Sequence, residues 1–235
     1  MKSSRVKRAA ILLTLSLMVT SLLSGCVKVP ADGLSRELVC FPGTEWNMTP
    51  EQVKKALSLS GDQYTVLMED TNGDFVFCVR DWDVLGKEAT VAFRFSDYTE
   101  GEHLGLAYVY VLFTGETDHA IIQNAVSAEI GEPDKYADNL CSWNSTETLA
   151  SYLDNAVPEL KELKPEKYDM LKEDPAAWLS LYNATGDTDE FCFLLDSLED
   201  RENVPALIFW GHRITQLLQY AQYGYPQPET TEAGG

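Results

Sequence analysis

The side chains that most often carry catalysis are scattered along this chain. Its only histidines are His103, His119 and His212, and none has a second potential ligand at the spacing of a known metal motif. The chain also lacks the GxSxG, Walker A and GxGxxG sequences, which indicate a hydrolase nucleophile, a nucleoside-triphosphate loop and a dinucleotide site. These patterns therefore predict no catalytic residue and no cofactor.

Paired carboxylates are a second arrangement that could do chemistry, because two acidic side chains can supply the acid and the base of glycan cleavage. Candidate groups are Asp81 with Asp83, Glu159 with Glu162, and Glu199 with Asp200 and Glu202. The chain contains 37 Asp and Glu residues, however. Such neighbours are expected by chance at this content, and no spacing singles out one pair.

One acidic segment has the spacing of a metal loop. Residues 70–74 read DTNGD, the opening of a calcium loop, and an acid also stands at the twelfth position. The candidate ligands are Asp70, Asn72, Asp74 and Asp81. Against this site, Phe75 occupies the sixth position, where a calcium loop needs Gly, and residues 75–79 have the pattern of a strand. The Asn-Gly pair between two apolar runs instead predicts the turn of a β-hairpin.

The N-terminus has the three-part pattern of a secretory signal. Four basic residues lie within 2–8, and residues 9–23 carry no charge. The uncharged stretch is shorter than the ~20 residues that a membrane-spanning helix needs, which makes a retained helix the weaker alternative. Leu23-Ser24-Gly25-Cys26 then closes the segment.

These four residues resemble the lipobox of bacterial lipoproteins. The resemblance implies cleavage before Cys26 and a diacylglyceryl group on its thiol, and two acyl chains hold a protein stably on a membrane. We therefore expect a lipid-anchored protein of the cell membrane or outer membrane that faces outside the cytoplasm. The alternative is ordinary secretion, with Cys26 incidental.

The charge of the chain limits its partners. The formal net charge is −19, and residues 1–25 contain four of the 18 basic residues and no acidic residue, so the remainder carries −23. Such a surface repels nucleic acid and anionic lipid head groups. It could favour a basic partner, or serve solubility alone.

The first half of the chain predicts an antiparallel sheet between two helices. Thr49, Pro50 and Gln52 provide a cap, a first-turn proline and a capping box for a helix over 50–59. Alternating apolar residues predict strands over 64–68, 75–79, 89–95 and 104–113, with Val91, Phe93 and Phe95 on one face and Arg94 on the other. A helix over 118–130 follows, with Thr117 as its cap and Gly131 at its end.

Residues 45–133 resemble outer-membrane assembly lipoproteins of the SmpA/OmlA type and β-lactamase-inhibitor-like domains. The similarity rests on Gly43 and Trp46, on residues 48–53, on the alternating strand 91–95 and on Ile130-Gly131-Glu132-Pro133. It has no catalytic signature. It implies a domain that acts through protein–protein contact.

The rest of the chain departs from that pattern and predicts mainly helix. Helices are expected over 145–153, 166–171, 175–182 and 214–223, and strands over 190–195 and 204–210. The predicted fold class is therefore α+β: a helix, a four-stranded antiparallel meander and a helix, followed by a mainly helical C-terminal part with one or two further strands. No internal repeat is evident, although a weak second copy of the first unit could be present in this part.

The expected organisation has five parts. These are the signal peptide 1–25, the lipidated cysteine and tether 26–38, the sheet domain 39–133, a mostly helical extension 134–223 packed on it, and a disordered tail 224–235. The hydrophobic content of 45% and the aromatic content of 11% exclude disorder across the body. Cys40, Cys78, Cys141 and Cys192 permit disulfides in an exported chain, and we expect at most one.

These observations favour a non-catalytic envelope lipoprotein that binds a protein partner, and no nucleic acid. The contact surface would be the sheet face or the C-terminal aromatic residues Tyr223 and Tyr225. The alternative is a lipid-anchored cell-wall hydrolase with unidentified carboxylates. A transporter's solute receptor fits least, because alternating βαβ patterns are missing.

Overall fold

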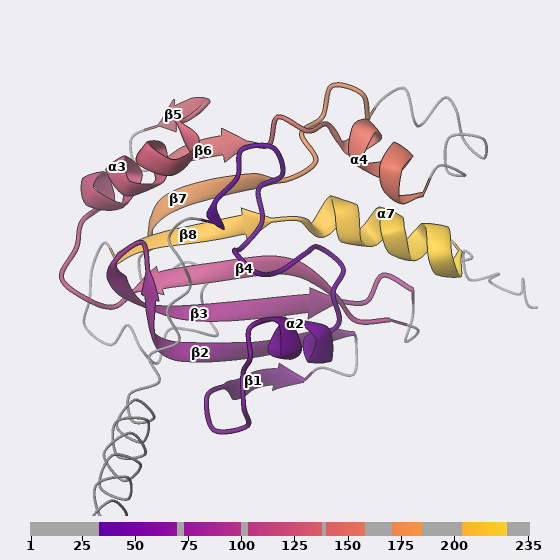
Figure 1. The fold of residues 1–235 in the computed structure, drawn as a ribbon, viewed down its shortest axis with the longest axis horizontal. Helices are drawn as coiled ribbons and strands as arrows, with labels where there is room; N and C mark the ends of the chain where they lie inside the picture. The colour runs from indigo at the N-terminus through magenta and orange to yellow at the C-terminus, as the bar shows by residue number, and fades with distance from the viewer. Residues whose placement is uncertain are drawn as a thin grey trace, which may run out of the picture.

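The computed structural model describes residues 33–69, 73–99, 103–137, 140–157, 171–184 and 204–224 (Figure 1). The helices within these ranges are α2 (Pro50–Ala56), α3 (His119–Ile130), α4 (Leu149–Ala156) and α7 (His212–Tyr223). The strands are β1 (Thr65–Glu69), β2 (Asp74–Val84), β3 (Lys87–Ser96), β4 (Gly105–Phe113), β5 (Lys135–Ala137), β6 (Leu140–Asn144), β7 (Trp178–Ala184) and β8 (Val204–Trp210).

All eight strands form one antiparallel sheet in the order β1-β2-β3-β4-β8-β7-β6-β5. The predicted fold class is therefore wrong, because the C-terminal part is not mainly helical and the first four strands are not a separate meander. Strands β5 to β8 continue the sheet through the β4–β8 pair. A pairing between residues about 100 positions apart leaves no signal in local periodicity.

The strand order divides the sheet into two similar halves. Among the described residues, each half is a helix followed by four strands, α2 with β1–β4 and α3 with β5–β8, and α4 lies between β6 and β7. The halves meet along their last strands, which run antiparallel, so a two-fold rotation would exchange them. This arrangement is what a second copy of the first unit would produce.

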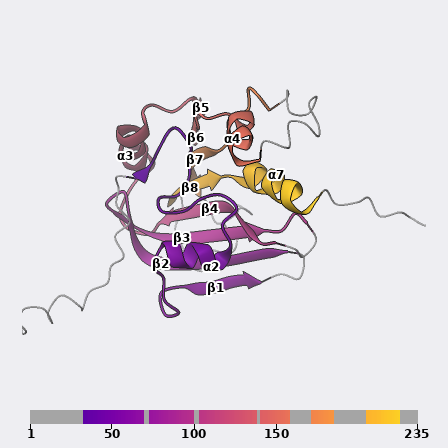
Figure 2. The same cartoon turned by 45° about the vertical axis from the view of Figure 1, so that its right-hand side comes forward.

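The described helices lie on one face of the sheet. The larger core cluster joins strand residues such as Phe93 and Phe209 to Val53 of α2, Ile122 of α3 and Ile214 of α7. The second cluster consists of strand residues alone among those described, from Val76 to Ile208. Figure 1 and Figure 2 both show α2 lying across β2 and β3. The sheet therefore has a helix-covered face and a second face.

Local signals explain where the helices begin and end. Thr49 caps α2 with the predicted capping box to Gln52, which is confirmed. In α3 the side chain of Asp118, not Thr117, accepts from the Ile121 N–H, so the predicted cap was one residue early. Gly131 ends α3 with φ 85°, a conformation that glycine adopts without strain.

The helix predicted over 175–182 is wrong, because these residues lead into β7 and then form it. Its sequence signal was Asp174 as a cap with Pro175 behind it. The Asp174 carboxylate instead accepts from Arg213 at 2.8 Å, and Pro175 forms an isolated bridge with Thr148. The predicted helices 145–153 and 214–223 correspond to α4 and α7, and the predicted strand 204–210 to β8. Of the helix predicted over 166–171 only residue 171 is described, and the strand predicted over 190–195 lies outside the described residues.

Residues 33–38, predicted as part of a tether, are fixed to the fold by Arg36. Its guanidinium donates to the carbonyl oxygens of Asn144 at 3.1 Å, Ile130 at 3.1 Å and Glu132 at 2.8 Å. It also pairs with Asp134 at 2.5 Å. One side chain thus ties the N-terminal segment to the end of α3 and to β6.

The segment after Arg36 lies on the helix-covered face. Leu34 and Leu38 pack against the larger core cluster, and Val39 and Phe41 belong to it. Phe41 makes edge contacts with several rings of this core, including Phe93 at a centroid distance of 5.4 Å. Within the described part of the chain, no helix has the length and apolar character needed to cross a membrane.

Candidate functional site

The predicted site residues are only partly described. Cys26, Asp70, Asn72 and Tyr225 lie outside the described residues. Asp74 accepts from Arg94 at 2.6 Å and from the Ser96 hydroxyl at 2.8 Å. Asp81 lies on the same extended strand, about 20 Å further along at 3.3 Å per residue. The strand keeps these two carboxylates apart, and no cluster of metal-ligating side chains occurs in the described ranges.

The predicted hairpin is confirmed, because β1 and β2 are consecutive antiparallel strands. Gly73 precedes β2 with φ 94°, and its carbonyl accepts from the Asp97 N–H at 2.8 Å. A side chain at this position would meet Asp97 at 3.1 Å as well as adopting a left-handed conformation. The glycine in the Asn-Gly pair therefore has a local structural role.

Tyr223, one of the two predicted contact residues, is 40% exposed on α7. Its ring stacks on His103 at 5.6 Å, and its hydroxyl lies 3.4 Å from Nδ1 of that histidine. The other ring nitrogen of His103 faces the Asn47 carbonyl at 3.3 Å. His103 thus connects the end of α7 to the loop before α2, and these contacts are structural.

The described cysteines are free thiols of low reactivity. Burial raises the pKa of Cys40 to about 12 and that of Cys141 to about 11, and it also raises the pKa of Cys78. These thiols are protonated near neutral pH, and the thiolate is the reactive form. None of the three is suited to act as a nucleophile.

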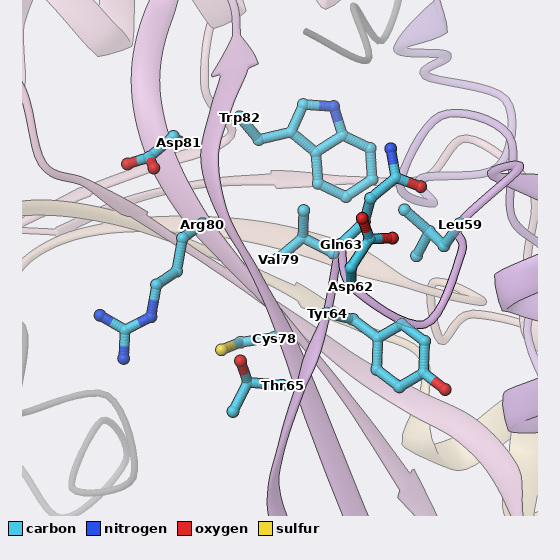
Figure 3. Close-up of a pocket in the computed structure, with 10 residues that line it drawn as sticks. All are labelled: Leu59, Asp62, Gln63, Tyr64, Thr65, Cys78, Val79, Arg80, Asp81 and Trp82. Carbon is cyan, nitrogen blue, oxygen red and sulfur yellow. The ribbon is translucent and has the colours of Figure 1, made fainter. Parts of the chain in front are cut away.

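A groove of about 320 Å³ follows the edge of β2 where β1 has ended (Figure 3). Pairing with β1 stops at Cys78, and β2 is then bulged between Val79 and Trp82, with Asp81 at φ 55°. Figure 3 shows Arg80 and Asp81 directed away from Tyr64 on the other side of the strand. A bulge and charged side chains are features that protect a sheet edge from pairing with another strand. We interpret this groove as a protected edge.

The second face of the sheet carries a continuous row of side chains across four strands. Arg94 of β3 is the register partner of Tyr108 of β4, which is the partner of Trp210 of β8, which is the partner of Trp178 of β7. The Arg94 guanidinium carbon lies 5.4 Å from the Tyr108 ring centroid. The centroids of Tyr108 and Trp210 are 5.5 Å apart, and those of Trp210 and Trp178 are 5.7 Å apart. We call these four residues the aromatic row.

His212 covers the middle of the aromatic row. Its ring lies parallel to Tyr108, with centroids 5.3 Å apart, and it meets Trp178 edge-on at 5.5 Å. Burial, and to a smaller extent the positive charge of Arg213, lowers the pKa of His212. The imidazole is therefore neutral near pH 7 and can stack without carrying charge. All five side chains are half-buried.

Polar atoms of this surface have no hydrogen-bond partner among the described residues. Seven buried side-chain nitrogen or oxygen atoms lack one, and three of them are here: Nε of Arg94, Nε1 of Trp210 and Nδ1 of His212. The other four belong to Trp82, Thr117, His119 and Ser127. Buried polar groups are almost always paired. These three atoms lie beneath the partly exposed surface of the stacked rings.

Only part of this surface could be predicted from the sequence. Alternation placed Arg94 opposite Phe93, and that assignment is confirmed, because Phe93 lies in the larger core cluster. Trp178 fell in the segment wrongly predicted as helix, and Trp210 fell at the end of the predicted strand 204–210. Only the strand order brings Tyr108 next to Trp210.

Searches for related proteins give no match to a family model, to a curated protein or to a solved structure.

Proposed function

We propose that this protein is a lipid-anchored protein of the bacterial envelope that binds a partner protein without catalysing a reaction. The anchor rests on the signal segment and on Cys26 at the end of the lipobox-like sequence. The binding function rests on the aromatic row, which is the single observation that carries it. Tryptophan, tyrosine and arginine are the residues most enriched at the energetic centres of protein interfaces.

The chemistry of the row favours a polypeptide as the bound partner. The rings are partly exposed and offer apolar surface that loses little side-chain entropy on binding. The net charge of −23 on the chain after residue 25 would accelerate association with a basic protein and would repel acidic ones. The proposed partner is therefore a basic protein segment with an apolar contact residue.

Site-specific photo-crosslinking in intact cells tests the binding surface. A photoreactive phenylalanine in place of Trp178 should give a defined adduct with one protein, and the same residue in place of Ile121 on α3, which is 42% exposed, should not. Trp210→Phe reduces the ring surface in the middle of the row and should weaken capture about tenfold. Trp82→Phe is the matched control, because it makes the same exchange of rings on the helix-covered face. Capture that is equal at both positions, or insensitive to Trp210→Phe, would contradict the proposal.

Two further measurements separate the parts of the proposal. Cells fed a labelled fatty acid should label the wild-type chain and not Cys26→Ala; absence of label on the wild type would remove the anchor. Purified protein should not cleave peptidoglycan. Turnover that is abolished by one carboxylate substitution in a folded variant would favour the hydrolase.

A further inference from the structure

His212 lies where the aromatic row meets the beginning of α7. It is the first residue of that helix, and its ring stacks on Tyr108 and meets Trp178 edge-on. The centroid of the same ring lies 6.3 Å from that of Trp210. One imidazole therefore lies beside all three rings of the row, so a change in its position changes the surface that the row offers to a partner.

The helix side of His212 favours a neutral imidazole. The first turn of a helix carries a partial positive charge, and Gly211, the cap residue of α7, supplies no side-chain hydrogen bond to that turn. Arg213 adds a full positive charge next to His212 in the chain. The carboxylate of Asp174 accepts from Arg213 at 2.8 Å, so it is already paired with a cation.

The sheet side also lacks a favourable charge for an imidazolium. Strands β7 and β8 present Trp178 and Trp210, which are uncharged. Strand β4 presents Tyr108, and burial raises the pKa of its hydroxyl, so the phenol is neutral as well. The ring of Tyr108 already lies 5.4 Å from the guanidinium of Arg94, whose partner is Asp74. A second cation on this ring would meet the repulsion of the first.

The hydrogen bonding of the imidazole leads in the same direction. Nδ1 of His212 is buried and has no partner among the described residues. Both ring nitrogens of a protonated histidine are donors, so protonation would leave a charged N–H buried without an acceptor, which is costly. A protonated ring is therefore more stable in water than in the stack.

We propose that His212 makes the aromatic row acid-sensitive: when its ring gains a proton it leaves the stack on Tyr108, and the row then binds its partner less tightly. The proposal rests on the binding function proposed above. A proton and the partner would compete, and each would reduce the affinity for the other by the same factor. Binding is then complete above the pH at which His212 titrates, and below it falls by at most about tenfold per pH unit.

Nuclear magnetic resonance of the purified protein tests the coupling between the proton and the stack. The chain has three histidines, and the signal of His212 is the one that His212→Phe removes. The pKa read from this signal should lie below the ordinary value of 6.5, because burial and then Arg213 lower it. The ring signals of Tyr108 should change along the same curve. A titration of His212 that leaves the Tyr108 signals unchanged would overturn the proposal.

Photo-crosslinking at two pH values tests the effect on binding. A photoreactive phenylalanine replaces Asn144, the register partner of Trp178 on β6, so that the row itself stays intact. Cells suspended at pH 5.0 should give at least about threefold less adduct than cells at pH 7.5. His212→Phe should keep most of its adduct at pH 5.0, because its ring cannot gain a proton. His103→Phe, the matched exchange outside the row, should lose adduct as the wild type does.

The results separate the acid sensitivity from the binding function. An equal amount of wild-type adduct at both pH values, or an equal loss in His212→Phe, would overturn the acid sensitivity and leave the binding function intact. Absence of a defined adduct at pH 7.5 would overturn the binding function and the acid sensitivity with it.

Discussion

Two rows of side chains cross the same four strands one residue apart, and they have opposite character. On the helix-covered face, Phe93, Val109, Phe209 and Leu179 are successive register partners, and each is at most 1% exposed. On the second face, the aromatic row places Arg94, Tyr108, Trp210 and Trp178 in the neighbouring positions, half-buried. The strands are common to both rows, so the backbone does not cause the difference.

The difference lies in the polar groups that the rings carry. Phenylalanine has none, so Phe93 and Phe209 can be enclosed without leaving a donor unpaired. Tyrosine and tryptophan combine a large ring with a polar group that needs a partner, which makes them suited to a boundary between apolar surface and water. Nε1 of Trp210 has no partner among the described residues. One row is complete within the fold, and the other is suited to a second molecule.

The largest expected effect is on stability and comes from the enclosed row. Phe93→Ala removes a ring that contacts Phe41, Phe77 and Trp82 in the middle of the core, and should lower the free energy of unfolding by about 3–5 kcal/mol. Denaturant unfolding followed by circular dichroism measures this loss. Leu179→Ala, in the same row but in the second half of the sheet, should cost about 2–5 kcal/mol in a single transition. Two separate transitions would show that the halves unfold independently.

A smaller loss of stability is expected from the aromatic row. Trp178→Ala should cost about 1–2 kcal/mol, because a half-buried ring loses less apolar contact than an enclosed one. The same substitution should abolish partner capture, whereas Phe93→Ala should reduce capture only in proportion to unfolding. A loss near that of Phe93→Ala would assign Trp178 to the core and contradict the contrast between the rows.

The alternating strands could be read from the sequence because each has its own local pattern. Val91, Phe93 and Phe95 face the core as predicted, and the capping box of α2 and the β1–β2 hairpin are confirmed. These signals depend on residues a few positions apart. They require no knowledge of which strand lies next to which.

The second half could not be read in the same way. Residues 204–209 of β8 are buried without alternation, and β7 follows an Asp-Pro pair that is typical of a helix start. The aromatic row depends on the β3–β4–β8–β7 order, which joins residues 94 and 210. Neither composition nor local spacing encodes that strand order, so the candidate site could be recognised only from the structure.

The charged side chain of the aromatic row should contribute less to the free energy of unfolding than the rings of the row do. Arg94→Ala removes the ion pair with Asp74 and the contact with the Tyr108 ring, and should cost about 1 kcal/mol, because both charged side chains are about one-third exposed. Arg36→Ala is a comparison outside the row and should cost more, about 2 kcal/mol, because it leaves three carbonyl oxygens without their donor. Thermal unfolding at low and high salt distinguishes them, since the Arg94 effect should largely disappear with screening, whereas the part of the Arg36 effect that comes from its carbonyl hydrogen bonds should remain. The reverse order would show that the N-terminal segment is not held by Arg36.

The smallest expected effect is the pH dependence that His212 gives to the aromatic row. Burial, and secondarily Arg213, lowers its pKa in the folded chain below the ordinary value of 6.5, so the unfolded chain binds a proton more readily. Stability from this group is therefore fully present above pH 6.5 and is lost as the pH falls below that value. His212→Phe keeps a ring against Tyr108 but cannot titrate, so the difference in unfolding free energy between the two proteins should change between pH 7.5 and 5.5, in favour of the variant at the lower pH. A constant difference between wild type and His212→Phe would show that the imidazole covering the row gains a proton as easily in the folded chain as in the unfolded one.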